Sequence, residues 1–251
     1  SSRELSPRWF GILAHHALEV FGESAKKDST DPEEIFNFLV QQLEARVHEQ
    51  YGEEPLPAIA VQKEQIKVRY RAFAAWQAKR AAAGWSIVHT EWKPESGGYL
   101  LDVDGEPMKI TGRIDRIDKH SDGRWAILDY KAADKPARLS SKPKKPEDWK
   151  DLQLPLYSLL TTELGIEDLP ELGYVTLARD TAEIHERIAK WDTGQLEDAV
   201  EAAKEVVRRV RAEDFFIPGK LPKYDDITRA VLGDGVLSIS SSDDEDEEGD
   251  E

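Results

Sequence analysis

Three aspartates and one lysine lie in two short segments that are otherwise rich in apolar residues. The segments are residues 112–118, Gly-Arg-Ile-Asp-Arg-Ile-Asp, and residues 124–131, Arg-Trp-Ala-Ile-Leu-Asp-Tyr-Lys. Because residues i and i+2 of a strand share a face, Asp129 and Lys131 point to the same side. If Asp115 meets Asp129 across a strand pair, two carboxylates and an ammonium converge, which is costly unless a cation lies between the carboxylates. A divalent metal ion supplies that charge.

The residue types at this point suit hydrolysis of a phosphodiester. Asp115 and Asp129 are hard oxygen ligands of the kind that Mg²⁺ prefers, and the backbone carbonyl of Tyr130 is a further oxygen donor. Such hydrolysis needs a metal to offset phosphoryl charge and a water made nucleophilic. Lys131 is placed to orient or deprotonate that water, or to stabilise the pentacoordinate phosphate; the alternative is a plain salt bridge between Asp129 and Lys131.

The elements that position these residues follow from hydrophobic periodicity and helix caps. A Ser-Asp-Gly turn at residues 121–123 joins the two segments, which predicts a β-hairpin. Pro155 lies close to the start of one expected helix, which predicts either that its regular part begins near Leu152 or that its first turn is distorted. We expect helices over 7–21, 32–51, 58–83, 149–164 and 193–212, and strands over 85–93, 99–103, 108–118, 124–131, 171–177 and 183–191.

Four motifs together resemble a known enzyme family. Ile114-Asp115 followed by Asp129-Tyr130-Lys131 is similar to the core of the PD-(D/E)xK nuclease superfamily, with Ile in place of the usual Pro. Gln153 and Tyr157, four residues apart, and the earlier segment 10–15, Phe-Gly-Ile-Leu-Ala-His, resemble the RecB/AddB branch, which includes Cas4-like exonucleases. The motifs occur in the expected order.

The resemblance implies an α/β fold with a restriction-endonuclease-like core, in which helices flank a mixed central β-sheet and an N-terminal helical segment precedes it. We therefore expect one nuclease domain over residues 1–238, divided into a helical segment at 7–84 and a sheet core with flanking helices at 85–212. Residues 239–251 are rich in Ser, Asp and Glu and are predicted to form a disordered acidic tail.

The resemblance also assigns roles to side chains. It implies that His15 is a metal ligand beside Asp115, Asp129 and the carbonyl of Tyr130; the alternative is a core histidine. An imidazole ligand makes Mn²⁺ an effective substitute for Mg²⁺.

The later motif has two interpretations. Gln153 and Tyr157 share one helical face and either support the backbone of the metal site and contact DNA, or pack simply, with Tyr157 against Leu160.

Other side chains are weaker candidates. Glu91 is either a further acidic group near the metal or a solvated strand residue. Arg113 shares the pleat face of Asp115 and is a better candidate for a phosphate contact than Arg116, which lies on the other face. Trp149 and the pair 215–216, Phe-Phe, either stack on unpaired bases or anchor a basic loop.

The chain contains no cysteine, which excludes disulfides, zinc–thiolate sites and a cysteine nucleophile. Many relatives of the RecB/AddB branch carry four cysteines that bind an iron–sulfur cluster. We therefore expect no iron–sulfur cluster here.

The net charge of −16 is unusual for a chain that binds nucleic acid. Eight acidic side chains lie within residues 243–251, which leaves −8 for the rest, and residues 131–150 carry a local charge of +4. A basic segment directly after Lys131 suits a phosphate backbone; the alternative is a solvated loop. The acidic tail either competes with DNA for this segment or only keeps the chain soluble.

These observations predict a Mg²⁺- or Mn²⁺-dependent deoxyribonuclease, more typical of an exonuclease than an endonuclease, that acts on single strands or duplex ends in repair or recombination. The alternative is a catalytically silent nuclease fold that binds DNA or serves as a scaffold. No Walker-type phosphate loop is present, so a helicase partner would be a separate chain. The absence of a signal peptide and of a long apolar run predicts a cytoplasmic protein without membrane contact.

Overall fold

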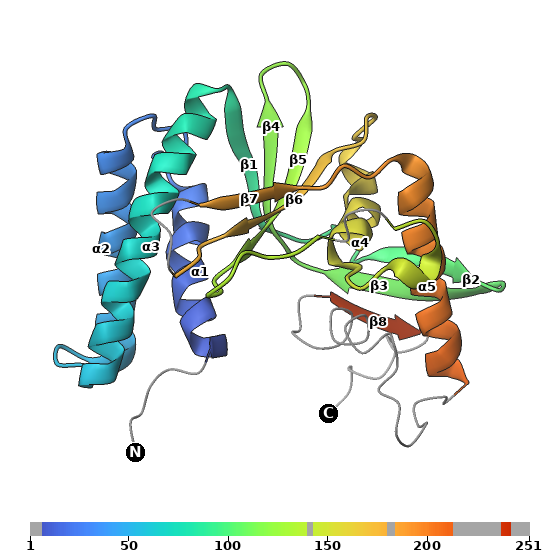
Figure 1. Cartoon of the computed structure of the whole chain (residues 1–251), viewed down its shortest axis with the longest axis horizontal. Coiled ribbons are helices and arrows are strands. Elements are labelled where there is room, and N and C mark those ends of the chain that lie inside the picture. The colour runs from blue at the N-terminus through green and yellow to red at the C-terminus, as the bar shows by residue number, and fades with distance from the viewer. Residues whose placement is uncertain (1–6, 140–142, 180–183, 213–236, 242–251) are drawn as a thin grey trace, which may run out of the picture. The chain divides into compact units, whose positions relative to one another are not determined.

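The computed structural model describes residues 7–139, 143–179, 184–212 and 237–241, with backbone alone in the last range (Figure 1). Its contacts divide the chain into two compact units, each built from three separate segments. The first unit comprises residues 1–91, 115–138 and 173–188, and the second comprises residues 92–114, 139–172 and 189–251. The single domain expected over residues 1–238 stays a prediction.

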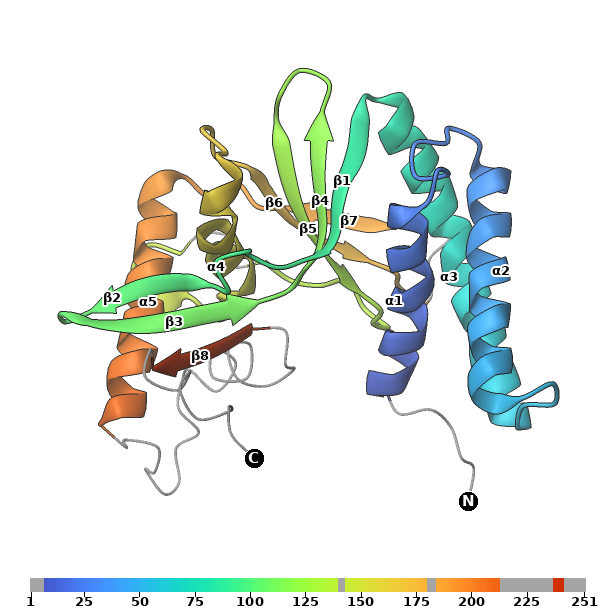
Figure 2. The ribbon, with the colours of Figure 1, turned by 180° about the vertical axis from the view of Figure 1, so that it is seen from behind.

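The first unit combines three helices with a mixed five-stranded sheet in the order β1-β4-β5-β6-β7, which confirms the α/β fold class. The helices stand side by side in both views (Figure 1, Figure 2). Their bounds are α1 Pro7–Glu23, α2 Pro32–Tyr51 and α3 Pro57–Ala82, and the strands are β1 Trp85–Trp92, β4 Ile114–His120, β5 Trp125–Lys131, β6 Glu171–Thr176 and β7 His185–Ile188.

Local signals place the ends of these helices. Asp31 caps α2 by accepting a hydrogen bond from the backbone N–H of Glu33, and Pro32 occupies the first turn. After α3, Gly84 adopts φ +95°, a left-handed conformation that favours glycine, and a Cβ there would lie 2.7 Å from the Ser121 hydroxyl. The three predicted helices are confirmed within two residues at each end.

The helices and the sheet enclose one apolar core. Phe21 of α1 meets Phe73 of α3 edge to face, with ring centroids 6.1 Å apart, and Phe73 in turn contacts the ring of Tyr130 on β5. Because α1 and α3 pack on this core, α1 is held against the strand that carries the predicted catalytic residues.

The second unit contains a three-stranded antiparallel sheet in the order β2-β3-β8. Its strands are β2 Tyr99–Val103, β3 Glu106–Gly112 and β8 Leu237–Ser241, its helices are α4 Gln153–Leu160 and α5 Thr193–Arg211, and its 3₁₀ turns are η1 Pro146–Asp148 and η2 Thr161–Leu164. The regular helix α4 thus begins at Gln153, beside the predicted start near Leu152.

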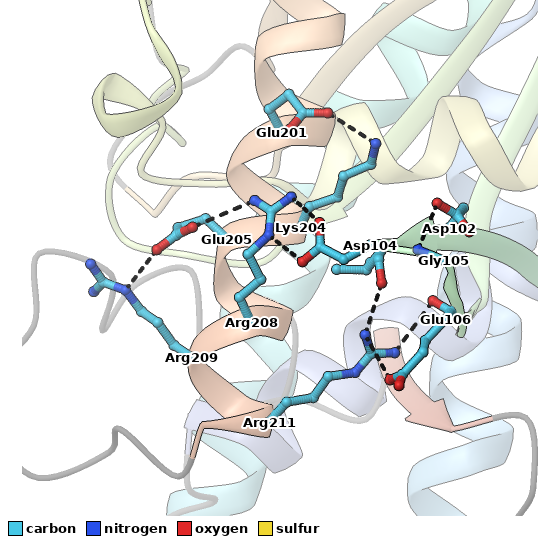
Figure 3. A network of polar contacts seen from close by, with 11 residues as sticks. Asp102, Asp104, Gly105, Glu106, Glu201, Lys204, Glu205, Arg208, Arg209 and Arg211 are labelled. Atoms are coloured by element: carbon cyan, nitrogen blue, oxygen red, sulfur yellow. Dashed lines mark hydrogen bonds and ion pairs between the residues drawn. The ribbon is translucent and has the colours of Figure 1, made fainter.

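Ion pairs link α5 to the turn between β2 and β3 (Figure 3). Arg208 binds Asp104 through Nε at 2.8 Å, and Arg211 donates to the carbonyl oxygen of Val103 at 3.0 Å. The hydrogen bond from Arg208 lowers the pKa of Asp104. Asp104 has φ +59°, as tight hairpin turns require. The contacts of Arg208 and Arg211 fix the hairpin within the second unit.

The structure differs from the sequence prediction in two segments, residues 108–118 and the start of the predicted tail. The single strand predicted over 108–118 is wrong: β3 ends at Gly112, β4 begins at Ile114, and the two strands belong to different sheets. Alternation reveals which side chains share a face, but not which strand lies beside them. Strand β8 overlaps the first three residues of the tail expected to be disordered, and residues 242–251 and 215–216 lie outside the described residues.

Candidate active site

The strand pair β4–β5 presents the two predicted carboxylates together. Its antiparallel register pairs Ile117 with Ile127 and Arg116 with Leu128, and Asp115 and Asp129 are the chain neighbours of this last pair. Asp115 Oδ2 accepts a hydrogen bond of 2.8 Å from the backbone N–H of Tyr130. Both carboxylates are buried. The first unit therefore holds two acidic groups side by side at the end of β5.

The Lys131 ammonium lies 2.7 Å from Oδ2 of Asp129, and 35 % of the lysine side chain is exposed against 3 % of the aspartate. The pKa of Asp129 is raised to about 6, chiefly by burial and also by the charge of Asp115, while the charge and hydrogen bond of Lys131 oppose this rise. One ammonium therefore does not offset the cost of holding this carboxylate ionised beside Asp115.

His15 lies beside these groups. The apolar side chains of α1 face the core, whereas His15 lies off that stripe with 30 % of its side chain exposed. Its Nδ1 is 3.8 Å from Oδ2 of Asp115, and its ring meets the ring of Tyr130 edge to face. The imidazole thus faces the acidic pair from the helix layer.

Tyr130 uses its backbone and its side chain in different ways. Its N–H orients Asp115, while its hydroxyl accepts a hydrogen bond of 3.0 Å from Nη1 of Arg116. Burial raises the pKa of Tyr130, so the phenol stays protonated at neutral pH. Tyr130 therefore connects Asp115, through its backbone, with the buried Arg116, through its side chain.

The donor set fits a divalent cation by its chemistry. Two carboxylates, a backbone carbonyl and an imidazole are the ligands that Mg²⁺ and Mn²⁺ accept, and the two carboxylates face a single ammonium, that of Lys131. Across the residues described, no three His, Asp or Glu side chains are already arranged to hold a metal ion. In this structure Lys131 and the N–H of Tyr130 take the carboxylate oxygens instead.

A second charged cluster, which the sequence analysis missed, lies on the same strand. Asp118 is fully buried and accepts hydrogen bonds from Nε of Arg116 at 2.6 Å and from Nε of Arg80 at 2.7 Å. Arg80 also binds Glu186 at 2.9 Å. The available signal was Asp118 itself, a charged residue on the apolar pleat face opposite Asp115.

Gln153 and Tyr157 belong to the second unit, whereas the carboxylates belong to the first. Gln153 Nε2 donates to the Tyr157 hydroxyl at 2.8 Å, and that hydroxyl donates to the carbonyl oxygen of Arg113 at 3.0 Å. Tyr157 is therefore bonded as well as packed. Its acceptor precedes Asp115 by two residues in the chain.

The weaker candidates differ in their exposure to solvent. The Trp149 ring is fully buried against Trp191 at 4.8 Å, so it anchors its segment and offers no surface to a base. The side chain of Arg113 is exposed. Glu91 is partly buried near the end of β1, with φ +48°, a backbone conformation that costs free energy outside glycine.

Comparison with known proteins identifies the family. The family model of the PD-(D/E)XK nuclease superfamily matches residues 1–220. The chain belongs to the PD-(D/E)XK nuclease superfamily. Within it, the chain is 30 % identical over 154 residues to one subunit of the ATP-dependent helicase/deoxyribonuclease of Clostridium acetobutylicum, which supports the RecB-like assignment. That match covers 54 % of this chain and 13 % of the relative.

Two absences accompany this assignment. The nuclease chain contains no cysteine with which to bind an iron–sulfur cluster. None of its described helices combines the length and the hydropathy needed to cross a bilayer.

Proposed function

We propose that this chain is a Mg²⁺- or Mn²⁺-dependent deoxyribonuclease that hydrolyses DNA phosphodiester bonds. The observation that carries the proposal is the meeting of Asp115, Asp129 and Lys131 at the end of β5, beside His15. A bound divalent ion would offset charge on the phosphoryl oxygens and make a water more acidic. Asp115, Asp129, His15 and the carbonyl of Tyr130 are its proposed ligands.

Lys131 has a separate role in this proposal. Its ammonium projects from the strand end with about a third of the side chain exposed, so it reaches both Asp129 and a phosphate that approaches from solvent. We assign it the orientation of the attacking water and the stabilisation of charge on the pentacoordinate phosphate. In this scheme the Lys131 ammonium leaves Asp129 and contacts the substrate phosphate when a metal ion binds to Asp129.

Gln153 and Tyr157 are proposed as supporting residues. Through the carbonyl of Arg113, the Tyr157 hydroxyl holds the backbone that leads into β4. This contact restrains the start of the strand that carries Asp115.

The name of the relative supports a finer proposal. It describes a protein that joins helicase and deoxyribonuclease functions. We propose that this chain cleaves single strands or duplex ends as an exonuclease in DNA repair or recombination, in the cytoplasm and beside a separate helicase. The basic segment 131–150 supports contact with a phosphate backbone.

The deciding experiment is digestion of end-labelled single-stranded and blunt duplex DNA with Mg²⁺, with Mn²⁺ and with EDTA. We expect cleavage with either metal and none with EDTA. Lys131→Ala should reduce the rate by about 10²–10⁴-fold. Lys119→Ala, which removes an exposed lysine from the neighbouring strand β4, serves as the control and should cleave like the wild type. Binding of DNA without cleavage under either metal would favour the silent scaffold instead.

A further inference from the structure

A groove of about 730 Å³ opens in the first unit where β5 ends. Its lining includes Phe10 of α1, several residues of α3, the segment 132–134 and Arg179, which follows β6. The volume falls within the range of small-molecule ligand sites. Lys131 immediately precedes the segment that lines it, so the groove begins where the catalytic strand stops.

The charge of the groove is positive and incompletely balanced. Its charged lining residues are Arg69, Arg179 and Asp134. Arg69 Nη2 lies 3.3 Å from Asp134 and Arg179 Nη1 lies 3.9 Å from it, so two guanidinium groups share one carboxylate. The carboxylate is 66 % exposed, and solvent screening keeps both of these ion pairs weak.

The two arginines differ in how firmly they are held. Arg69 is buried, donates to the carbonyl oxygen of Leu177 at 2.8 Å and stacks over the ring of Phe10 at 4.7 Å. Arg179 is 55 % exposed and has Asp134 as its acidic neighbour. Arg69 is therefore a fixed cation on the floor of the groove, and Arg179 is a cation at its rim that an incoming anion can recruit.

The side of the groove formed by α3 carries apolar and amide groups, which suit contact with nucleic-acid bases. Val61 is 58 % exposed, and Gln62 and Gln65 line the groove beside it. An exposed valine gives base faces an apolar contact, and amides donate to and accept from base edges. In a duplex these edges are paired, whereas an unpaired strand presents both its faces and its edges.

The groove lies close to the proposed catalytic residues along two elements of the first unit. Phe10 precedes His15 by five residues on α1, which corresponds to about 7.5 Å along the helix axis. Ala132 follows Lys131 directly. Two elements of the same unit therefore run from the groove to the site.

We propose that this groove binds unpaired nucleotides of the DNA strand next to the bond that is cleaved. In this arrangement a backbone phosphate displaces Asp134 from Arg179, Arg69 supplies a fixed positive field, and Val61 with the two glutamines contacts bases. The inference rests on the proposed nuclease function and adds to it a specificity for single strands. It also gives Asp134 a defined role as an internal competitor of the phosphate.

The test measures binding of a short fluorescent single strand and of the matching blunt duplex to the full chain in EDTA. Arg179→Ala should weaken single-strand binding about fivefold and reduce the slope of log affinity against log salt by about 0.7, the contribution of one phosphate contact. Asp134→Asn should strengthen binding, because it removes the competing carboxylate. Opposite signs for two neighbouring substitutions are not expected from a loss of folding.

Arg71→Ala is the matched control. Arg71 is an arginine of the same unit with 52 % of its side chain exposed, and it pairs with one carboxylate, Glu33, but does not line the groove. It should bind both DNA forms like the wild type. Unchanged affinity in Arg179→Ala, weaker binding in Asp134→Asn, or equal losses for single strand and duplex would overturn the inference. Since binding in EDTA needs no cleavage, a wild-type chain that binds but does not cut defeats the nuclease proposal alone.

Discussion

Strand β4 carries two buried aspartates three residues apart, and their surroundings differ. Asp118 accepts hydrogen bonds from Arg80 and Arg116, and Glu186 completes a cluster of two positive and two negative groups. Asp115 instead faces a second carboxylate, and Lys131 supplies the ammonium beside them. With histidine counted as neutral, the first cluster is balanced and the second keeps an excess negative charge.

The difference separates a structural role for Asp118 from the catalytic role proposed for Asp115. A buried ion cluster whose charges balance needs no further charge from outside. A buried pair of carboxylates with one ammonium remains costly, and the pKa of Asp129, raised to about 6, expresses that cost. We infer that the Asp115 cluster is kept in this state because a cation from solution completes it.

Substitution at the functional aspartate should give the largest effect. Asp115→Asn removes a proposed metal ligand while leaving an oxygen that accepts from the N–H of Tyr130. We expect DNA cleavage to fall by about 10³-fold, as when a charge-stabilising group is removed from a catalytic centre. Circular dichroism and thermal unfolding should remain those of a folded chain. Cleavage within tenfold of the wild-type rate would contradict the assignment of a catalytic role to Asp115.

Substitution at the structural aspartate should affect folding instead. Asp118→Asn leaves two buried guanidinium groups without their carboxylate, which costs about 3–5 kcal/mol of unfolding free energy. Urea unfolding followed by tryptophan fluorescence measures this loss. The fraction that remains folded should cleave DNA at a rate close to that of the wild type. A folded Asp118→Asn chain with normal stability but no activity would reverse the roles of the two clusters.

The two clusters were unequally visible in the sequence. Period-2 alternation and one turn are local features, so Asp115 and Asp129 were predicted on facing strands, whereas His15 was singled out through the resemblance. Arg80, one of the two arginine partners of Asp118, lies 38 residues earlier on the last turn of α3, and no local pattern specifies that contact. The groove is likewise assembled from distant segments, so neither was anticipated.

The break at Arg113 illustrates the same limit. The alternation of residues 108–118 continues through the break, and so the sequence predicted one strand where the chain changes sheets. Tyr157, 44 residues later, binds the carbonyl oxygen of Arg113 at this point. A backbone acceptor has no side-chain signature, so the pairing of Gln153 with Tyr157 was predictable only through the resemblance.

The raised pKa of Asp129 predicts a pH dependence of stability. The carboxyl has a pKa of about 6 when folded and about 3.8 when unfolded, so the folded chain holds its proton more tightly. The cost is therefore fully present above pH 6 and is relieved as the pH falls toward 3.8. The shift corresponds to at most about 3 kcal/mol.

Asp129→Asn isolates this contribution. In EDTA at pH 8 the variant should be more stable than the wild type, by less than that limit because Lys131 loses its ion pair. By pH 5 the advantage should shrink by about 1 kcal/mol. Urea unfolding of both chains at the two pH values gives the difference. An advantage that grows toward low pH would contradict the raised pKa.

Tyr130→Phe should give the smallest effect and tests whether the clusters act separately. The hydroxyl belongs to the structural cluster through Arg116, while the backbone N–H that binds Asp115 is unchanged by the substitution. We expect a loss of about 1–2 kcal/mol in unfolding free energy, because one buried donor of Arg116 loses its acceptor. The cleavage rate should stay within a few-fold of the wild-type value, and Mn²⁺ should still raise the unfolding temperature. If the variant instead lost as much activity as Asp115→Asn, the two clusters would form one coupled site, and the balanced charges around Asp118 would belong to the catalytic machinery.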